Sequence, residues 1–119
     1  MARSMKGPSQ RCLRVGEEVR HILSDLLARR ELPMEALQGQ SITVTEVRMS
    51  ADLRQANVYV IPLGGKGGAE AVKALQAIAP KMRHFLAKQM SMKAVPHLRF
   101  HYDATFDEVD RVDALLRDM

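Results

Sequence analysis

Positive charge collects in one part of this chain with no carboxylate among it. Residues 71–102 contain no Asp or Glu, and their cations are Lys73, Lys81, Arg83, Lys88, Lys93 and Arg99. Residues 1–16 are also free of acid and carry Arg3, Lys6, Arg11 and Arg14. Lysine and arginine segregated in this way favour contact with a polyanion, most often the phosphates of a nucleic acid. The simpler alternative is a basic surface that only keeps the protein soluble.

The candidate phosphate contacts fall into two groups. The first group follows a helix break at Pro80 and consists of Lys81, Arg83, Lys88 and Lys93. The second group consists of Arg99, Arg11 and Arg14. The chain holds two Tyr, three Phe and no Trp, so few rings are available to stack on bases. We therefore expect recognition of RNA shape and backbone rather than of bases.

No set of residues in the sequence predicts catalysis or metal binding. His97, His101 and Asp103 could serve as metal ligands, but two histidines four residues apart on a strand lie about 13 Å from each other. No serine stands in a GxSxG motif, and the acids near the C-terminus are more simply the solvated face of a helix. We expect a protein that is not an enzyme and that needs no cofactor and no metal.

The composition favours a soluble cytoplasmic protein. The first eleven residues are basic but lack the apolar run of a signal peptide, and no stretch of eighteen apolar residues exists. Cys12 is the only cysteine, which excludes an intramolecular disulfide and a thiolate zinc cluster. A reducing cytosol fits this cysteine content.

The first half of the chain predicts a helix followed by a β-hairpin. Residues 1–9 have the composition of a flexible arm. Residues 10–30 place their apolar side chains on one helical face, and Ser9 is the expected N-cap. Residues 41–49 and 57–63 are rich in β-branched residues and predict two strands. The segment SADLR between them predicts a tight turn formed by Asp52.

The second half predicts a broken helix, a strand and a last helix. Helices are expected over residues 69–78 and 80–92, because Pro80 ends one helix and suits the first position of the next. Residues 97–102 alternate cleanly, with His97, Arg99 and His101 on the outward face. An acidic amphipathic helix is expected over residues 103–119. The prediction is one α+β domain over residues 10–117, with three strands and helices packed on one face.

Two features near the middle of the chain could hold phosphate. The loop GGKGG at 64–68 matches the GxxG pattern that clamps a nucleotide backbone, but it follows a strand, and we interpret it as a flexible connection. The break at Pro80 lies between two helices, where a helix N-terminus and a basic helical face could both meet an anion. The alternative for this break is a bend that serves packing only.

Three stretches of the sequence together resemble one known family. They are RCLRVGEEVRHILSDLL at 11–27, ITVTEVRMSADLRQANVYV at 42–60 and VPHLRFHYDATFDEVDRVDALL at 95–116. The pattern S-x-D-L-R-x-A-x-V-Y-V, joined to P-x-L-x-F-x-x-D, is the most diagnostic. On these motifs the chain resembles the ribosome-binding factor A family. The resemblance implies a KH-like fold of the type II order, with a kinked helix pair in place of the GxxG loop. The family kink usually reads Ala-x-Gly, and the matching triplet here is Ile78, Ala79 and Pro80.

The resemblance also implies a role in ribosome biogenesis. Members of this family bind the free 30S subunit and its 16S rRNA, and they support late 30S maturation and pre-16S rRNA processing, notably in the cold. They are non-enzymatic, and an assembly GTPase is a familiar functional partner. Nothing in the sequence of this chain demands more than a monomer. The rival hypothesis from the residues is a basic module that docks an acidic protein.

Overall fold

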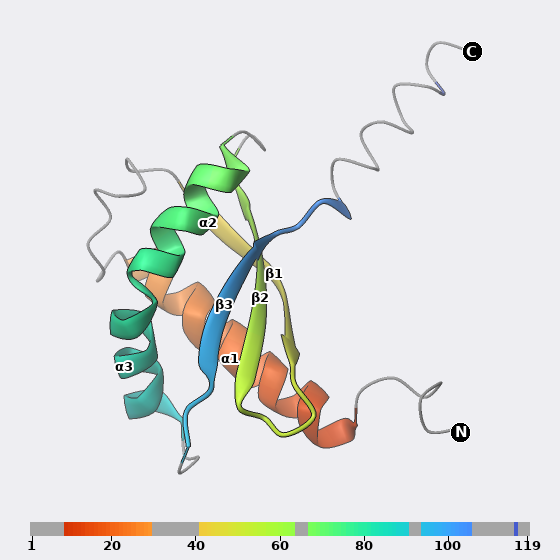
Figure 1. Cartoon of the computed structure of the whole chain (residues 1–119), viewed down its shortest axis with the longest axis vertical. Coiled ribbons are helices and arrows are strands. Elements are labelled where there is room, and N and C mark those ends of the chain that lie inside the picture. Colours follow the sequence, from red (N-terminus) through yellow and green to blue (C-terminus); the bar gives the residue numbers. More distant parts are fainter. Residues whose placement is uncertain (1–8, 30–40, 64–66, 91–93, 106–115, 117–119) are drawn as a thin grey trace.

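The computed structural model describes residues 9–29, 41–63, 67–90, 94–105 and 116. The described elements follow the order helix, strand, strand, helix, helix, strand. In chain order they are α1 (Gln10–Arg29), β1 (Ile42–Met49), β2 (Gln55–Pro62), α2 (Gly68–Ala77), α3 (Ala79–Gln89) and β3 (His97–Tyr102) (Figure 1). This is the order expected for a KH-like domain of type II. Most of the helix predicted over 103–119, most of the arm at 1–9, and Lys93 lie outside the described residues.

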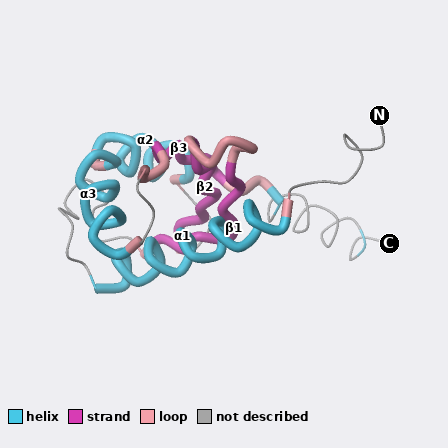
Figure 2. Tube along the Cα trace, turned by 90° about the horizontal axis from the view of Figure 1, so that it is seen from below, coloured by secondary structure: helices cyan, strands magenta, loops and turns pink. Residues whose placement is uncertain are grey.

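One three-stranded sheet organises the fold. The strand order is β1-β2-β3, with β1 and β2 antiparallel and β2 and β3 parallel. A hairpin turn joins β1 to β2, whereas the parallel pair requires a crossover, which α2 and α3 supply. Figure 2 shows α1 beneath the strands and α3 at one side of them. The predicted α+β class, with helices on one face of the sheet, is confirmed.

The helices and the inner face of the sheet share one core. The inner face of β2 and β3 buries Ala56, Val58, Val60, Leu98 and Phe100. Against it pack the apolar side chains of the three helices, among them Val19, Leu23, Leu75, Met82 and Leu86, all fully buried. Burial of each such side chain is worth about 1.5–3 kcal/mol, so this shared core holds the helices to the sheet.

The helix α1 runs very close to β1 at Gly16. Gly16 is buried, and a Cβ atom on it would lie 2.8 Å from the carbonyl oxygen of Val47. Only a residue without a side chain permits this approach. The N-cap predicted at Ser9 is confirmed, because its Oγ accepts a hydrogen bond from the Cys12 amide at 3.1 Å.

The turn between β1 and β2 is closed by the predicted residue. Asp52 Oδ1 accepts hydrogen bonds from the Ser50 hydroxyl at 2.7 Å and from the Arg54 amide at 3.1 Å. The Ser50 hydroxyl in turn accepts from the Gln55 amide at 2.9 Å. Leu53 takes a positive φ of 61° at the tip. These bonds start β2 at Gln55, two residues before the predicted boundary.

A β-bulge interrupts the β1–β2 pairing. Val44 pairs with Val60 and Glu46 pairs with Tyr59, which leaves Thr45 as the extra residue. The bulge explains the imperfect alternation of β1, since it keeps both Val44 and Val47 on the inner face. The residue pattern of β1 alone does not predict it.

Candidate nucleic-acid interface

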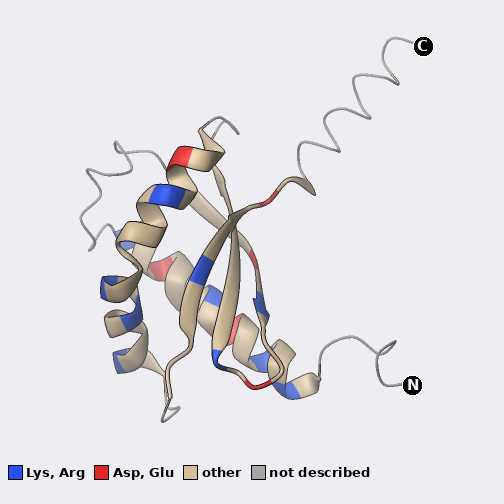
Figure 3. Cartoon of the chain, in the orientation of Figure 1, with Lys and Arg blue, Asp and Glu red and all other residues tan. Residues whose placement is uncertain are grey.

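The helix α3 presents a basic face to solvent. Lys81, His84 and Lys88 are exposed, and their spacing of three and four residues aligns them on one side of the helix. Met82 and Leu86 are buried on the opposite side. No acidic residue occurs on α3, which carries only basic charge in Figure 3. Together Lys81, His84 and Lys88 form what we term the α3 basic face.

The ring of Phe85 supports one cation of this face. The Lys88 ammonium nitrogen lies 5.7 Å from the centroid of the half-buried Phe85 ring. Contact with a ring face favours the cation and restrains its stem without neutralising its charge. The Lys88 ammonium group is therefore held at a defined place on the surface.

The break between α2 and α3 is centred on Ile78. This residue ends α2 and also precedes α3, and its φ and ψ of −98° and 7° are not helical. The helix α3 begins at Ala79, so Pro80 is its second residue and not the first, which corrects the expected boundary by one residue. Pro80 has no amide hydrogen, and the Lys81 amide already donates to the Ile78 carbonyl at 3.0 Å. The basic side chains, rather than free main-chain amides, are thus the groups that this kink offers to phosphate.

Arg83 is bonded to the main chain beyond α3. Its Nε donates to the Pro96 carbonyl at 3.3 Å, and its Nη2 donates to the Val95 carbonyl at 2.8 Å. These two bonds fasten α3 to the segment that leads into β3. The prediction of Arg83 as a phosphate contact rests on its charge alone, and no pattern in the sequence indicates this second role.

A shallow hollow adjoins the α3 basic face. It has a volume of about 470 Å³ and is lined by Pro80, Arg83, His84, Ala87, Ala94 and Val95. Arg83 supplies its positive charge, the His84 ring adds a polar group, and no acid lines it. A sugar-phosphate segment that lay along Lys81 and Lys88 would therefore meet an acid-free surface beside it.

The other predicted contacts lie on separate surfaces. Arg99 is exposed on the outward face of β3. Arg11 and Arg14 are exposed on the first turns of α1, at the far end of the domain from α3 (Figures 2 and 3). The structure therefore brings Lys81, Arg83 and Lys88 together on α3 and separates them from the second group.

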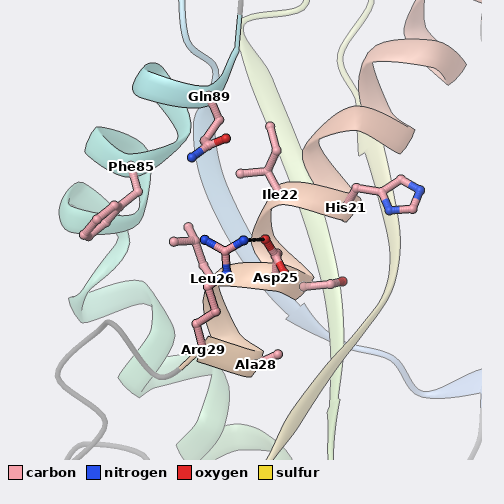
Figure 4. A pocket seen from close by; sticks show the side chains of 9 residues that line it. His21, Ile22, Asp25, Leu26, Ala28, Arg29, Phe85 and Gln89 are labelled. Atoms are coloured by element: carbon pink, nitrogen blue, oxygen red, sulfur yellow. Dashed lines mark ion pairs between the residues drawn. The ribbon is translucent and has the colours of Figure 1, made fainter.

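The hollow between α1 and α3 has a different character (Figure 4). It encloses about 460 Å³, and its apolar wall includes Ile22, Leu26 and Phe85. Its acid, Asp25, is paired with Arg29 at 2.7 Å. Its other polar lining residues include His21, Ser24 and Gln89. Among the described residues, no cluster of His, Cys, Asp and Glu could hold a metal ion.

The outward face of the sheet carries aromatic residues that the sequence did not single out together. The rings of Tyr59 and His101 are stacked, with centroids 5.0 Å apart and an interplanar angle of 25°. The guanidinium carbon of Arg48 lies 5.5 Å from the Tyr59 centroid. The alternation of β3 predicts that His101 faces outward, but its neighbour on β2 depends on strand register, which the sequence leaves open.

Comparison with known proteins decides the family. The model of the family described as Ribosome-binding factor A matches residues 11–116. This chain belongs to the ribosome-binding factor A family. The family that the motifs indicated is thereby confirmed.

Relatives in this family are similar over nearly the whole chain. Ribosome-binding factor A of Xanthobacter autotrophicus is 53% identical over 111 residues, which cover 93% of this chain and 74% of the relative. The protein of the same name from Azorhizobium caulinodans is 52% identical over 115 residues, covering 97% of this chain and 79% of the relative.

Solved ribosome-binding factor A structures share the fold. A solution NMR structure from Thermotoga maritima matches with a TM-score of 0.65 and 28% identity, covering 81% of this chain and 90% of the other. The Thermus thermophilus crystal structure matches with a TM-score of 0.63 and 24% identity, covering 76% and 94%. A Thermus thermophilus homology model fitted into a cryo-EM map of a 30S–RbfA complex matches with a TM-score of 0.58 and 25% identity, covering 74% and 90%. None of the described helices is both long and apolar enough to cross a bilayer.

Proposed function

We propose that this protein binds the free 30S ribosomal subunit through its 16S rRNA and acts as a non-enzymatic assembly factor. Its family membership supports the ribosome as partner, and its Thermus thermophilus relative has been fitted into a 30S complex. The observation that carries the mode of binding is the α3 basic face, an acid-free helix with Lys81 and Lys88 exposed. Both lysines contact phosphate in this proposal.

The remaining predicted contacts have secondary roles in the proposal. Arg83 positions α3 and adds positive charge to the hollow beside it. Lys93, Arg99, Arg11 and Arg14 extend the contact to other parts of a folded RNA. Binding serves late 30S maturation and pre-16S rRNA processing in the cytoplasm, where the protein acts as a monomer alongside an assembly GTPase.

Co-sedimentation tests the partner. The purified protein is sedimented with free small subunits, large subunits and assembled ribosomes, at low and at moderate salt. We expect selective, salt-sensitive binding to free small subunits. Equal binding to all three particles would indicate a generic polyanion binder and contradict the proposal. Retention of the protein by an acidic protein after RNase treatment would favour the rival hypothesis.

A charge-matched pair of variants tests the site. Lys81→Glu with Lys88→Glu reverses two charges on the α3 basic face. Lys73→Glu with Arg54→Glu makes the same change in net charge at exposed residues of α2 and of the β1–β2 turn. We expect loss of small-subunit binding in the first variant only, with both variants folded by circular dichroism. Equal affinities in the two variants would reject the α3 basic face as the binding site.

A further inference from the structure

The outward face of the sheet holds an ordered row of side chains across all three strands. Arg48 from β1, Tyr59 from β2 and His101 from β3 follow one another, with the Arg48–Tyr59 and Tyr59–His101 separations given above. His101 Nε2 also lies 2.9 Å from the Asn57 side-chain oxygen. The row is therefore fixed by stacking and by a hydrogen bond, and its order follows the strand order.

The row has an open end at β3. Tyr59 stacks on the His101 ring from the side of the central strand β2, and His101 itself stands on β3, an outer strand of the sheet. A hollow of about 540 Å³ lies there, with His101 in its wall. Neighbouring strands lie about 4.8 Å apart, close to the separation of the Tyr59 and His101 rings, so a flat ring in this hollow would continue the row as its next layer.

The charge of the hollow indicates what kind of ring it accepts. Its lining includes exposed His97 and Arg99, amide side chains from Gln55 and Gln76, and no acidic residue. A ring that carries a phosphate would place the phosphate near Arg99 and its own polar edge near the amides. These are the chemical features of a nucleotide.

The edge of β3 is closed to a different occupant, an added peptide strand. The Gln76 side chain donates to the Leu98 carbonyl at 3.1 Å and accepts from the Phe100 amide at 3.0 Å. These main-chain groups point away from β2 and are the ones that a fourth strand would need. Because Gln76 occupies these two main-chain groups, an added strand cannot pair with them, whereas the His101 ring remains available for stacking.

We infer that this hollow binds one unpaired RNA base, stacked on the His101 ring, with its phosphate at Arg99. The inference rests on the proposed function only in taking RNA as the partner, since the hollow lies on a different surface from the α3 basic face. It gives Arg99 a defined place in RNA binding. It also adds base contact to a protein whose aromatic content predicts recognition of backbone alone.

NMR titration of the full chain with two short oligomers tests the inference. Pentaadenylate supplies bases and phosphates, whereas an abasic ribose-phosphate pentamer supplies the phosphates only. We expect pentaadenylate to move the His101 ring-proton resonances upfield through the ring current of the stacked base, and the abasic pentamer to leave them in place. The His84 resonances on α3 serve as an internal control and should respond similarly to both.

Variants of His101 measure how much the ring contributes to the affinity for pentaadenylate. A stacked base is worth enough that His101→Ala should weaken pentaadenylate binding about 5- to 100-fold, while His101→Phe, which keeps a ring, restores most of it. His21→Ala on α1 is the matched control and should bind as the wild type does. The β3 amide resonances report whether each variant keeps its fold.

The possible results separate this inference from the proposed function. Absence of pentaadenylate binding, equal His101 shifts with both oligomers, or a His101 shift with pentaglutamate instead would each overturn the inference. The variant with Lys81→Glu and Lys88→Glu should still show the His101 shift at saturation. Small-subunit binding without a His101 shift would support the proposed function and overturn the inference. A His101 shift without small-subunit binding would support the inference and overturn the proposed function.

Discussion

The hydroxyl of Thr45 hydrogen-bonds the carboxylate of Asp103. Thr45 is the extra residue of the bulge in β1, and Asp103 follows the last residue of β3, so the bond links the two outer strands across β2. The Asp103 amide donates to the Val60 carbonyl at 2.9 Å, and its carboxylate accepts from the Thr105 amide at 3.0 Å. Asp103 thus ties the end of β3 to its neighbour β2 and to β1, the strand on the far side of β2.

Removal of either the Thr45 hydroxyl or the Asp103 carboxylate should lower the free energy of unfolding, and the two losses should overlap because one hydrogen bond joins the two groups. Thr45→Val and Asp103→Asn should each reduce the free energy of unfolding by about 1 kcal/mol, because a hydrogen bond to a charged but half-exposed group is lost. The double variant should lose less than the sum of the two. Urea denaturation measures all three, with Thr43→Val, at an exposed position of β1, as the control. Strictly additive losses would mean that the bond contributes nothing.

The same carboxylate should make stability depend on acid pH. The hydrogen bond from Thr45 lowers the pKa of Asp103, and the bonds from Thr105 add to the effect. A lowered pKa in the folded state gives stability that is complete above the ordinary aspartate pKa and is lost as the pH falls through the lowered value. The difference in unfolding free energy between wild type and Asp103→Asn should therefore be constant near neutral pH and shrink below about pH 4. A difference that persists unchanged in acid would contradict this assignment.

Gly16→Ala should force α1 away from the sheet. The added Cβ would meet the Val47 carbonyl at 2.8 Å, and the main chain has no flexible end that could move aside. We expect a loss of about 1–3 kcal/mol in unfolding free energy, although alanine is the better helix former. Glu18→Ala, at an exposed position on α1, should be close to neutral in the same assay. If the Gly16→Ala variant proved as stable as the wild type, α1 would have to shift freely against β1.

Arg83→Lys should separate the two roles of this residue. Lysine keeps the positive charge but cannot reproduce the fork that bonds the Val95 and Pro96 carbonyls. We expect a loss of about 1–2 kcal/mol in stability and nearly unchanged small-subunit affinity at a temperature where both proteins are folded. A large loss of affinity with intact stability would instead assign Arg83 to direct RNA contact.

The salt dependence of the RNA affinity should reveal how many phosphate contacts the α3 basic face makes. Each contact contributes a slope of about 0.7–0.9 in log affinity against log salt. Replacement of Lys81 and Lys88 by alanine should therefore lower the slope by about 1.4–1.8. Filter binding to a 16S rRNA fragment over a salt series measures it, with Lys73→Ala as the control. An unchanged slope would exclude both lysines from the interface.

Much of the fold follows from local patterns in the sequence. The apolar spacing along α1 places Val19 and Leu23 in the core, and both are fully buried. The alternation along β3 places Leu98 and Phe100 inside and Arg99 outside, as the structure has them. These predictions succeed because each depends on the periodicity of one element, which packing against a single neighbour enforces.

The features that could not be predicted depend on pairs of distant elements. The bulge at Thr45 is fixed by register against β2 and by Asp103, and nothing adjacent to Thr45 in the sequence signals it. The bonds from Arg83 to the Val95 and Pro96 carbonyls join α3 to a segment twelve and thirteen residues later. The stack of Tyr59 on His101 likewise exists only once β2 and β3 align. For the candidate site, the sequence identifies the basic residues of α3. It does not indicate that one of them, Arg83, is bonded to the main chain before β3.

The bulge in β1 also bears on how this protein behaves at high concentration. β1 is an outer strand, and an outer strand that is regular and flat is a template on which other chains pair and aggregate. Thr45 breaks that regularity, and the exposed Glu46 and Arg48 beside it place charge where an incoming strand would lie. The irregularity that anchors Asp103 is therefore also a safeguard for solubility.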